Sequence, residues 1–220
     1  MKSGNLQTSD TFLLSAVLSL SGGLQDAYTY FQRGEVFANA QTGNVVLMSQ
    51  NFMEGNVDAG FQYMMPLLAF ALGIFIAERV EGSLKENPVM HWRQLIIMIE
   101  IGALVLVGML PPEVKLIANM IVSFSCAMQV QTFRKVHGYG YASTMCIGNL
   151  RSGTESLSAY LRDRNKTDLV KAVYFFSILF IFAIGAGVGG VLSRLLGIGT
   201  IWISAGLLII ALAMMERETS

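Results

Sequence analysis

Apolar residues along the chain gather in six segments that are long enough to cross a membrane. The segments cover residues 12–31, 61–77, 95–110, 116–133, 173–192 and 200–214. A transmembrane helix needs about 20 mostly apolar residues. Pro111 and Pro112 close the third segment, Arg134 and Lys135 follow the fourth, and the glycine-rich residues 197–199 separate the last two. The pattern predicts an all-α membrane protein with six transmembrane helices.

Two further segments, residues 36–52 and 141–161, mix apolar residues with amides and hydroxyls. Each contains a Gly-Asn pair near its middle, Gly43-Asn44 in the first and Gly148-Asn149 in the second. Glycine tolerates sharp bends, and asparagine can hydrogen-bond the backbone groups that a broken helix leaves unpaired. Both segments are therefore expected to be broken or re-entrant helices. Two alternatives remain: they cross as full spans, which gives eight, or the Gly-Asn pairs only allow close packing of kinked helices.

The placement of basic residues favours six spans, because Lys and Arg collect in the cytoplasmic loops next to membrane helices. With six spans and a cytoplasmic N-terminus, only Arg33, Lys115 and Arg194 of the 15 Lys and Arg residues lie outside. Eight spans would divide the same residues almost evenly. The sequence thus predicts a multi-pass protein of the bacterial cytoplasmic (inner) membrane with both termini in the cytoplasm.

The order of the segments repeats within the single predicted domain, residues 1–220. Leu24-Gln25 and Met128-Gln129 precede the two Gly-Asn pairs, and the motif at residues 70–73 recurs at residues 182–185. The repeats cover about residues 11–111 and 114–216. Because three spans is an odd number, the second half enters the membrane inverted relative to the first. An inverted 3+3 repeat with interrupted helices near the midplane is typical of secondary transporters.

Composition narrows the function classes. Hydrophobic residues make up 53% of the chain and charged residues 14%, whereas about a quarter of an average soluble domain is charged. Acidic and basic residues balance at 15 each, so nucleic acid is not an expected partner. Cys126 and Cys146 lack metal-ligand spacing, so neither a metal nor a cofactor is expected. The chain also lacks a His cluster or nucleophile elbow, so we do not expect an enzyme.

Three ionisable residues lie in or near the expected spans. A carboxyl group inside a membrane is costly and usually faces the bundle interior or a cavity, so Asp26 is a candidate for proton coupling or solute binding. A structural hydrogen bond near the first Gly-Asn segment is the alternative for Asp26. Glu100 should have a partner. Arg151 could pair with Asp26 or with an anionic solute, or it could be exposed at the interface.

The polar residues around the Gly-Asn pairs complete the candidate site. A half-helix that begins there would point free N–H groups and a positive dipole end into the interior. The candidate solute- or ion-binding residues are Gln25, Asp26, Thr42, Gly43, Asn44, Glu100, Gln129, Gly148, Asn149 and Arg151.

The motif Gly23-Leu24-Gln25-Asp26-Ala27, followed by Val36-Phe37-Ala38-Asn39 and Thr42-Gly43-Asn44, resembles the YoaK-like family of uncharacterised bacterial multi-pass membrane proteins. The resemblance covers essentially the whole chain. It implies a small helical membrane protein, often with six spans, and no established activity. One departure lies in the second half, where the family tends to have Thr-Gly and this chain has Ile147-Gly148-Asn149.

These features predict a small secondary transporter or channel-like carrier for a small polar or anionic solute, with coupling to protons through Asp26. The alternative is a membrane scaffold or sensor that does not transport and acts through a partner at its basic cytoplasmic loops. The lipid bilayer and the solute are the expected partners. A homo-oligomer is also expected, since six short spans enclose a site poorly.

Overall fold

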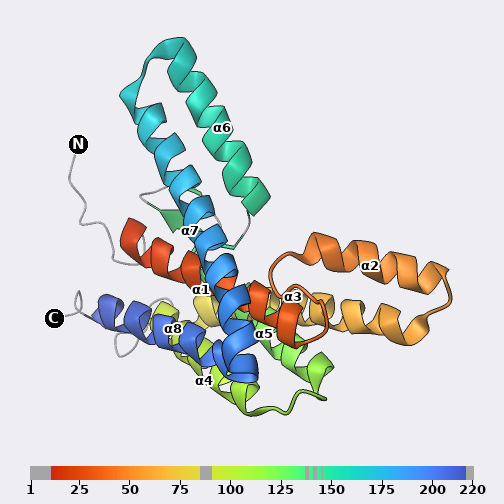
Figure 1. Ribbon diagram of the computed structural model, residues 1–220. Coiled ribbons are helices and arrows are strands. Elements are labelled where there is room, and N and C mark those ends of the chain that lie inside the picture. The colour runs from red at the N-terminus through yellow and green to blue at the C-terminus, as the bar shows by residue number, and fades with distance from the viewer. Residues whose placement is uncertain (1–10, 85–90, 137–138, 141–142, 145, 217–220) are drawn as a thin grey trace.

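The computed structural model describes residues 11–84, 91–136, 139–140, 143–144 and 146–216 (Figure 1). Within these residues the chain forms eight α-helices, a short 3-10 helix and one small antiparallel hairpin. The elements are α1 (Phe12–Gln32), α2 (Gln41–Met53), α3 (Val57–Leu84), α4 (Trp92–Met109), α5 (Lys115–Thr132), β1 (Lys135–Val136), β2 (Tyr139–Gly140), α6 (Cys146–Asp163), α7 (Lys166–Leu196), η2 (Gly197–Thr200) and α8 (Ile201–Glu216).

The helices associate in a small number of pairs. The most extensive contacts join α1 to α7 and α3 to α5. Helix α2 packs against α3, and α6 packs against α7. Helix α4 contacts both α5 and α8, and α8 also contacts α1. The α2–α3 and α6–α7 hairpins project from the bundle in different directions, and α1 begins on the side where α8 ends (Figure 1).

Glycines allow the two principal pairs to pack backbone against backbone. A Cβ atom added at Gly185 of α7 would overlap the carbonyl oxygen of Leu20 in α1. A Cβ atom at Gly73 of α3 would likewise overlap the carbonyl oxygen of Phe124 in α5. Small residues at such positions are the usual means by which membrane helices approach closely, because burial of apolar side chains gives no advantage inside lipid.

The outer surface is apolar, as expected for helices in contact with lipid. Large apolar side chains are exposed on α3, α4, α7 and α8, among them Leu72, Phe75, Val105, Val188 and Ile210. The buried residues of α1 and α5, in contrast, include many serines, amides and one carboxyl group. A polar interior under an apolar exterior supports a membrane protein.

Three stretches of the described residues are long and apolar enough to cross a membrane, namely Val57–Leu84, Trp92–Met109 and Lys166–Met215. The third runs from α7 through η2 into α8. Helices α1 and α5 are more polar because their inward faces carry buried residues such as Gln25, Asp26 and Gln129. The expected total of six spans stays a prediction.

The two Gly-Asn segments differ from the expectation in one respect. Gly43 and Gly148 do not interrupt a helix in its middle, because each is the third residue of a helix, α2 or α6. Residues 36–40, with bends at Ala38 and Asn39, lead into α2. Residues 141, 142 and 145 of the second segment lie outside the described residues. Helices α3, with 28 residues, and α7, with 31, are also longer than the apolar segments that predicted them.

Arg33 was expected in an outer loop, but its side chain is fully buried at the end of α4. Its guanidinium donates hydrogen bonds to the carbonyl oxygens of Val107 at 2.9 Å, Leu110 at 2.8 Å and Pro111 at 2.7 Å, and to the Tyr28 hydroxyl at 2.8 Å. The last carbonyls of a helix lack internal partners and carry partial negative charge. Arg33 therefore closes the C-terminal end of α4 and joins it to α1.

Replacing Arg33 by Met is expected to destabilise the protein. A hydrogen bond to a charged group contributes roughly 1.5–3 kcal/mol, and the variant leaves one buried and two partly buried carbonyl groups without these donors. We expect the free energy of unfolding to fall by at least about 2 kcal/mol, measured as thermal unfolding in detergent. The control is Arg194→Met, because Arg194 is exposed in α7. Equal effects of both substitutions would contradict the role given to Arg33.

Candidate functional site

A cavity of about 550 Å³ lies where the N-terminal ends of α2 and α6 come together. Its walls also include residues of α1, α3 and α7 and the residues that precede α2 and α6. The described residues that line it are Asp26, Asn39, Ala40, Gln41, Thr42, Gly43, Leu67, Phe70, Thr144, Cys146, Ile147, Gly148 and Phe182. Segments about 105 residues apart in the sequence thus share one cavity.

Two helix N-termini border this cavity. The first N–H groups of a helix have no internal partner, and the dipole places partial positive charge there. No side chain caps the N-terminus of α2, whose first three residues, 41–43, all line the cavity. Of their N–H groups, those of Gln41 and Gly43 donate to the carbonyl oxygens of Asn39 at 2.9 Å and Ala40 at 3.1 Å. The first three residues of α6, 146–148, line it as well. Backbone N–H groups at such ends are suited to bind anionic or polar groups.

Asp26 supplies the carboxyl group of the cavity. Its side chain is 4% exposed, and its Oδ1 atom accepts a hydrogen bond of 2.7 Å from the backbone N–H of Asn39. The Asn39 side chain in turn donates to the carbonyl oxygen of Gly22 at 3.3 Å. No ion pair of Asp26 is found within the described part of the chain. Asp26 therefore lines the cavity and also fixes the loop before α2. The structural hydrogen bond expected of this residue is present, and its role in proton coupling or solute binding stays a prediction.

Gln25 and Glu100 form a second buried polar group. Gln25 Nε2 donates to Glu100 Oε1 at 3.3 Å and to Ser21 Oγ at 3.1 Å, and Cys126 Sγ donates to Gln25 Oε1 at 2.7 Å. Glu100 thus has the partner that its position required. Neighbouring residues of a helix point in different directions, which explains why Gln25 joins α1 to α4 and α5 while Asp26 faces the cavity.

Two of the remaining amides, Asn44 and Gln129, hold the structure around the site. Asn44 accepts a hydrogen bond from the backbone N–H of Phe37 at 3.1 Å and donates to the Phe37 carbonyl at 2.6 Å. Gln129 Nε2 donates to Ser143 Oγ at 2.9 Å. Asn149 is buried, with 3% of its surface exposed. None of the three is among the described residues that line the cavity. Thr42, Gly43 and Gly148 are.

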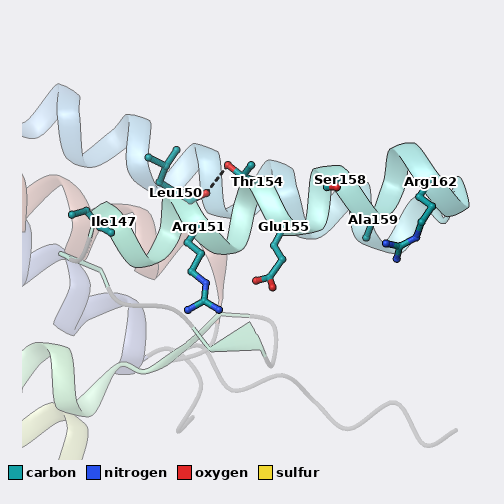
Figure 2. Close-up of a pocket in the computed structure, with 8 residues that line it drawn as sticks. All are labelled: Ile147, Leu150, Arg151, Thr154, Glu155, Ser158, Ala159 and Arg162. Atoms are coloured by element: carbon teal, nitrogen blue, oxygen red, sulfur yellow. Dashed lines mark hydrogen bonds between the residues drawn. The ribbon is translucent and has the colours of Figure 1, made fainter.

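Arg151 does not pair with Asp26. Arg151 is exposed and lines a separate depression on the outer face of α6, next to Glu155 (Figure 2). It lies one helical turn beyond Ile147, which borders the cavity. Because α6 runs away from the bundle toward its hairpin tip, each further turn moves a side chain farther from Asp26 (Figure 1). Of the readings open for Arg151, exposure is the one that the structure shows.

Several residues of the cavity were not predicted as site residues. Asn39 and Thr144 come just before α2 and α6, and Cys146 begins α6. Phe70 and Phe182 occupy equivalent places in the repeated motif of residues 70–73 and 182–185, and both line the cavity. That repetition was the signal that could have identified the two phenylalanines.

Comparison with known proteins agrees with a membrane protein and with the resemblance of the motifs. The family model described as "Protein of unknown function (DUF1275)" matches residues 14–214. The chain is 25% identical over 185 residues to the UPF0700 transmembrane protein YoaK of Bacillus subtilis (strain 168), a match that covers 79% of this chain and 80% of YoaK. No solved structure matches the chain. With nearly its whole length matched, the chain belongs to the DUF1275 family of proteins of unknown function.

Proposed function

We propose that the protein is a small secondary transporter or carrier that moves a small polar or anionic solute together with protons. The observation that carries this proposal is the cavity at which the N-termini of α2 and α6 meet beside the Asp26 carboxyl group. Solute sites of many secondary transporters lie where interrupted helices point their N-termini at a common centre.

We further propose that the two halves form an inverted repeat of three spans each. The contacts between helices support it. If each helix of the first half, α1 to α4, is renamed as its counterpart in the second half, α5 to α8, and the reverse, the main contacting pairs turn into one another. The pair α1–α7 then becomes α5–α3, α2–α3 becomes α6–α7, and α1–α8 becomes α5–α4, and all of these are observed contacts.

Individual contacts support the same exchange. Gly185 of α7 meets the Leu20 carbonyl group, and Gly73 of α3 meets the Phe124 carbonyl group. Leu20 and Phe124 lie 104 positions apart, the same offset as between Gln25 and Gln129. Gly73 and Gly185 are the last residues of the repeated motif. A two-fold relation between the halves accounts for both glycine contacts at once.

The cavity fits a small solute. A volume of about 550 Å³ lies within the usual range of roughly 300–1,000 Å³ for small-molecule sites. Its described walls contain no Lys or Arg, so an anion would depend on the two helix N-termini. A charged Asp26 would repel that anion, whereas a protonated Asp26 would not. Binding of the proton and binding of the anion therefore favour each other, and this is the requirement for symport.

The proposed topology has six spans, with both termini in the cytoplasm of a bacterium. The beginning of α1 and the end of α8 lie on one side of the bundle, which an even number of crossings requires (Figure 1). In this arrangement α2 enters from outside and α6 from inside, so their N-termini reach the centre from opposite faces.

Flux into proteoliposomes tests the proposal. The purified protein would be reconstituted and supplied with a panel of labelled small anions, amino acids and polar neutral solutes, with and without an inward proton gradient. We expect uptake of at least one solute class that exceeds the uptake of protein-free vesicles and increases with the gradient. Absence of flux for the whole panel, in vesicles where the protein is shown to be folded, would contradict transport.

A scaffold or sensor function remains the second candidate. The feature that favours it is the α6–α7 hairpin, which projects from the bundle and carries Arg162, Arg164 and Lys166 at its tip (Figure 1). A scaffold, however, has no need of a cavity with a carboxyl group and two helix N-termini, and the transporter reading accounts for both.

A further inference from the structure

The cavity between α2 and α6 has apolar walls beside its polar groups. Leu67 and Phe70 of α3, Ile147 of α6 and Phe182 of α7 all line it. Leu67 and Phe70 are three residues apart, so they lie on one face of α3. Small-molecule sites are usually lined by apolar and aromatic side chains, with a few polar groups that fix the orientation of the ligand. These walls therefore indicate what kind of body the solute has, whereas the helix N-termini indicate its charge.

Phe182 lies next to the carboxyl group of the cavity. A Cβ atom added at Gly22 of α1 would lie 3.7 Å from the Cε2 atom of the Phe182 ring. Gly22 and Asp26 are four residues apart, so they are neighbours on one face of α1. The ring therefore packs against α1 about one helical turn from Asp26. Phe70, which has the equivalent place in the first half, is 8% exposed and lines the same cavity, so each half supplies one aromatic side chain.

The size of the cavity argues against a bare inorganic ion. A water molecule occupies roughly 30 Å³ of the liquid, and a cavity of about 550 Å³ is far larger than a small inorganic anion requires. Water in the remaining space would leave the apolar side chains of the walls hydrated. An apolar body of the solute would instead remove their surface from water, which is favourable.

We propose that the solute is an organic anion with an apolar body, of the kind that an aromatic carboxylate represents. Its anionic group binds at the N-termini of α2 and α6, and its apolar body packs between Phe70 and Phe182. Inorganic anions, which have no apolar body, are excluded. The inference rests on the proposed function, because it names the class of solute for the same cavity.

The Asn39 side chain explains how an anion is accommodated beside a carboxyl group. It lies within hydrogen-bonding reach of the Asp26 carboxyl group. Its Oδ1 atom is buried and has no hydrogen-bond partner among the described residues. A buried acceptor without a donor is costly, and a protonated Asp26 can donate to it, whereas a charged Asp26 cannot. The free acceptor thus favours the uncharged form of Asp26, beside which an anion can bind.

A matched set of ligands tests the inference on the unaltered protein. The purified protein in lipid nanodiscs is mixed with radiolabelled phenylacetate in mildly acidic buffer, and unlabelled compounds compete for the site. Phenylacetate should bind at least about tenfold more tightly than acetate, which has the same anionic group without the ring. It should also bind more tightly than phenethylamine, whose ring carries a cation in place of the anion. Absence of saturable phenylacetate binding, equal competition by acetate, or stronger competition by phenethylamine would overturn the inference.

Two substitutions test the aromatic residues themselves. Phe70→Ala and Phe182→Ala each remove one ring and should weaken phenylacetate binding roughly tenfold, while competition by acetate stays unchanged. The matched control is Phe180→Ala, which removes an exposed ring from the same helix two positions before Phe182 and should change neither affinity. Equal weakening of both ligands, or an effect of Phe180→Ala as large as that of Phe182→Ala, would contradict the role given to the rings.

Binding is measured without a gradient, so its outcome is separate from that of the flux experiment. Phenylacetate binding without uptake of any solute would contradict transport and support the inferred chemistry of the site. Uptake of another class of solute without phenylacetate binding would support transport and overturn the inference.

Discussion

Asp26→Asn is expected to abolish proton-driven accumulation of the solute while the protein keeps its fold. The amide is close in size to the carboxyl group, and its oxygen can still accept the hydrogen bond from the Asn39 backbone N–H. It cannot take up or release a proton. We expect uptake driven by a proton gradient to fall at least about tenfold, whereas exchange of labelled for unlabelled solute at equal pH should persist.

The matched control is Asp58→Asn, which removes an exposed carboxyl group from the first turn of α3 and should leave both activities unchanged. The two assays separate the roles open to Asp26. Loss of exchange together with accumulation would indicate that the carboxyl group holds the solute or the α2 loop. Unaltered accumulation in Asp26→Asn would show that proton coupling does not use this residue.

Gly185→Val is expected to prevent correct packing of α1 against α7. The Cβ atom of the new side chain would overlap the Leu20 carbonyl oxygen, which belongs to backbone and cannot rotate away. Inserting bulk into a well-packed interface costs roughly 1–3 kcal/mol and sometimes more. Because the obstacle is backbone, we expect the upper end of that range or beyond, seen as a lower unfolding temperature and as aggregation during purification.

Gly187→Val is the control for this substitution, because a Cβ atom at Gly187 in the same helix would meet no atom within 4 Å apart from its chain neighbours and the backbone of its own helix. Both variants add the same side chain to α7, so differences in helix propensity cancel. If Gly185→Val were as stable as Gly187→Val, the close α1–α7 packing described above would be incorrect.

Much of the architecture follows from local sequence features. The apolar segments predicted most of the helices, because a membrane-spanning helix is identified by the length and apolar composition of one continuous segment. The Gly-Asn pairs identified the two helices that border the cavity, and the carboxyl group of Asp26 indicated a polar interior. The repeated order of these features predicted two related halves, which the exchange of helix contacts supports.

The partners of individual side chains could not be predicted in this way. Whether an amide faces a cavity or its own backbone depends on the residue at which α2 begins. The sequence did not predict that first residue to within one helical turn. The Asn44 side chain consequently hydrogen-bonds the backbone of Phe37 and does not face the cavity, and Arg151 lies beyond the cavity on α6. The burial of Arg33 depends on the end of α4, 74 positions away in sequence, so no local pattern predicts it.

The central claim is that two inverted halves bring α2 and α6 to one cavity from opposite sides of the membrane. Single cysteines at Asn56, in the α2–α3 turn, and at Thr167, at the start of α7, test it most directly in a background without Cys126 and Cys146. Both positions are exposed. Intact cells are treated with a membrane-impermeant maleimide, and permeabilised cells show that both sites can react. The inverted arrangement predicts that position 56 reacts in intact cells and position 167 reacts only after permeabilisation. If both positions react from the same side, α2 and α6 do not enter from opposite faces, and the inverted arrangement is wrong.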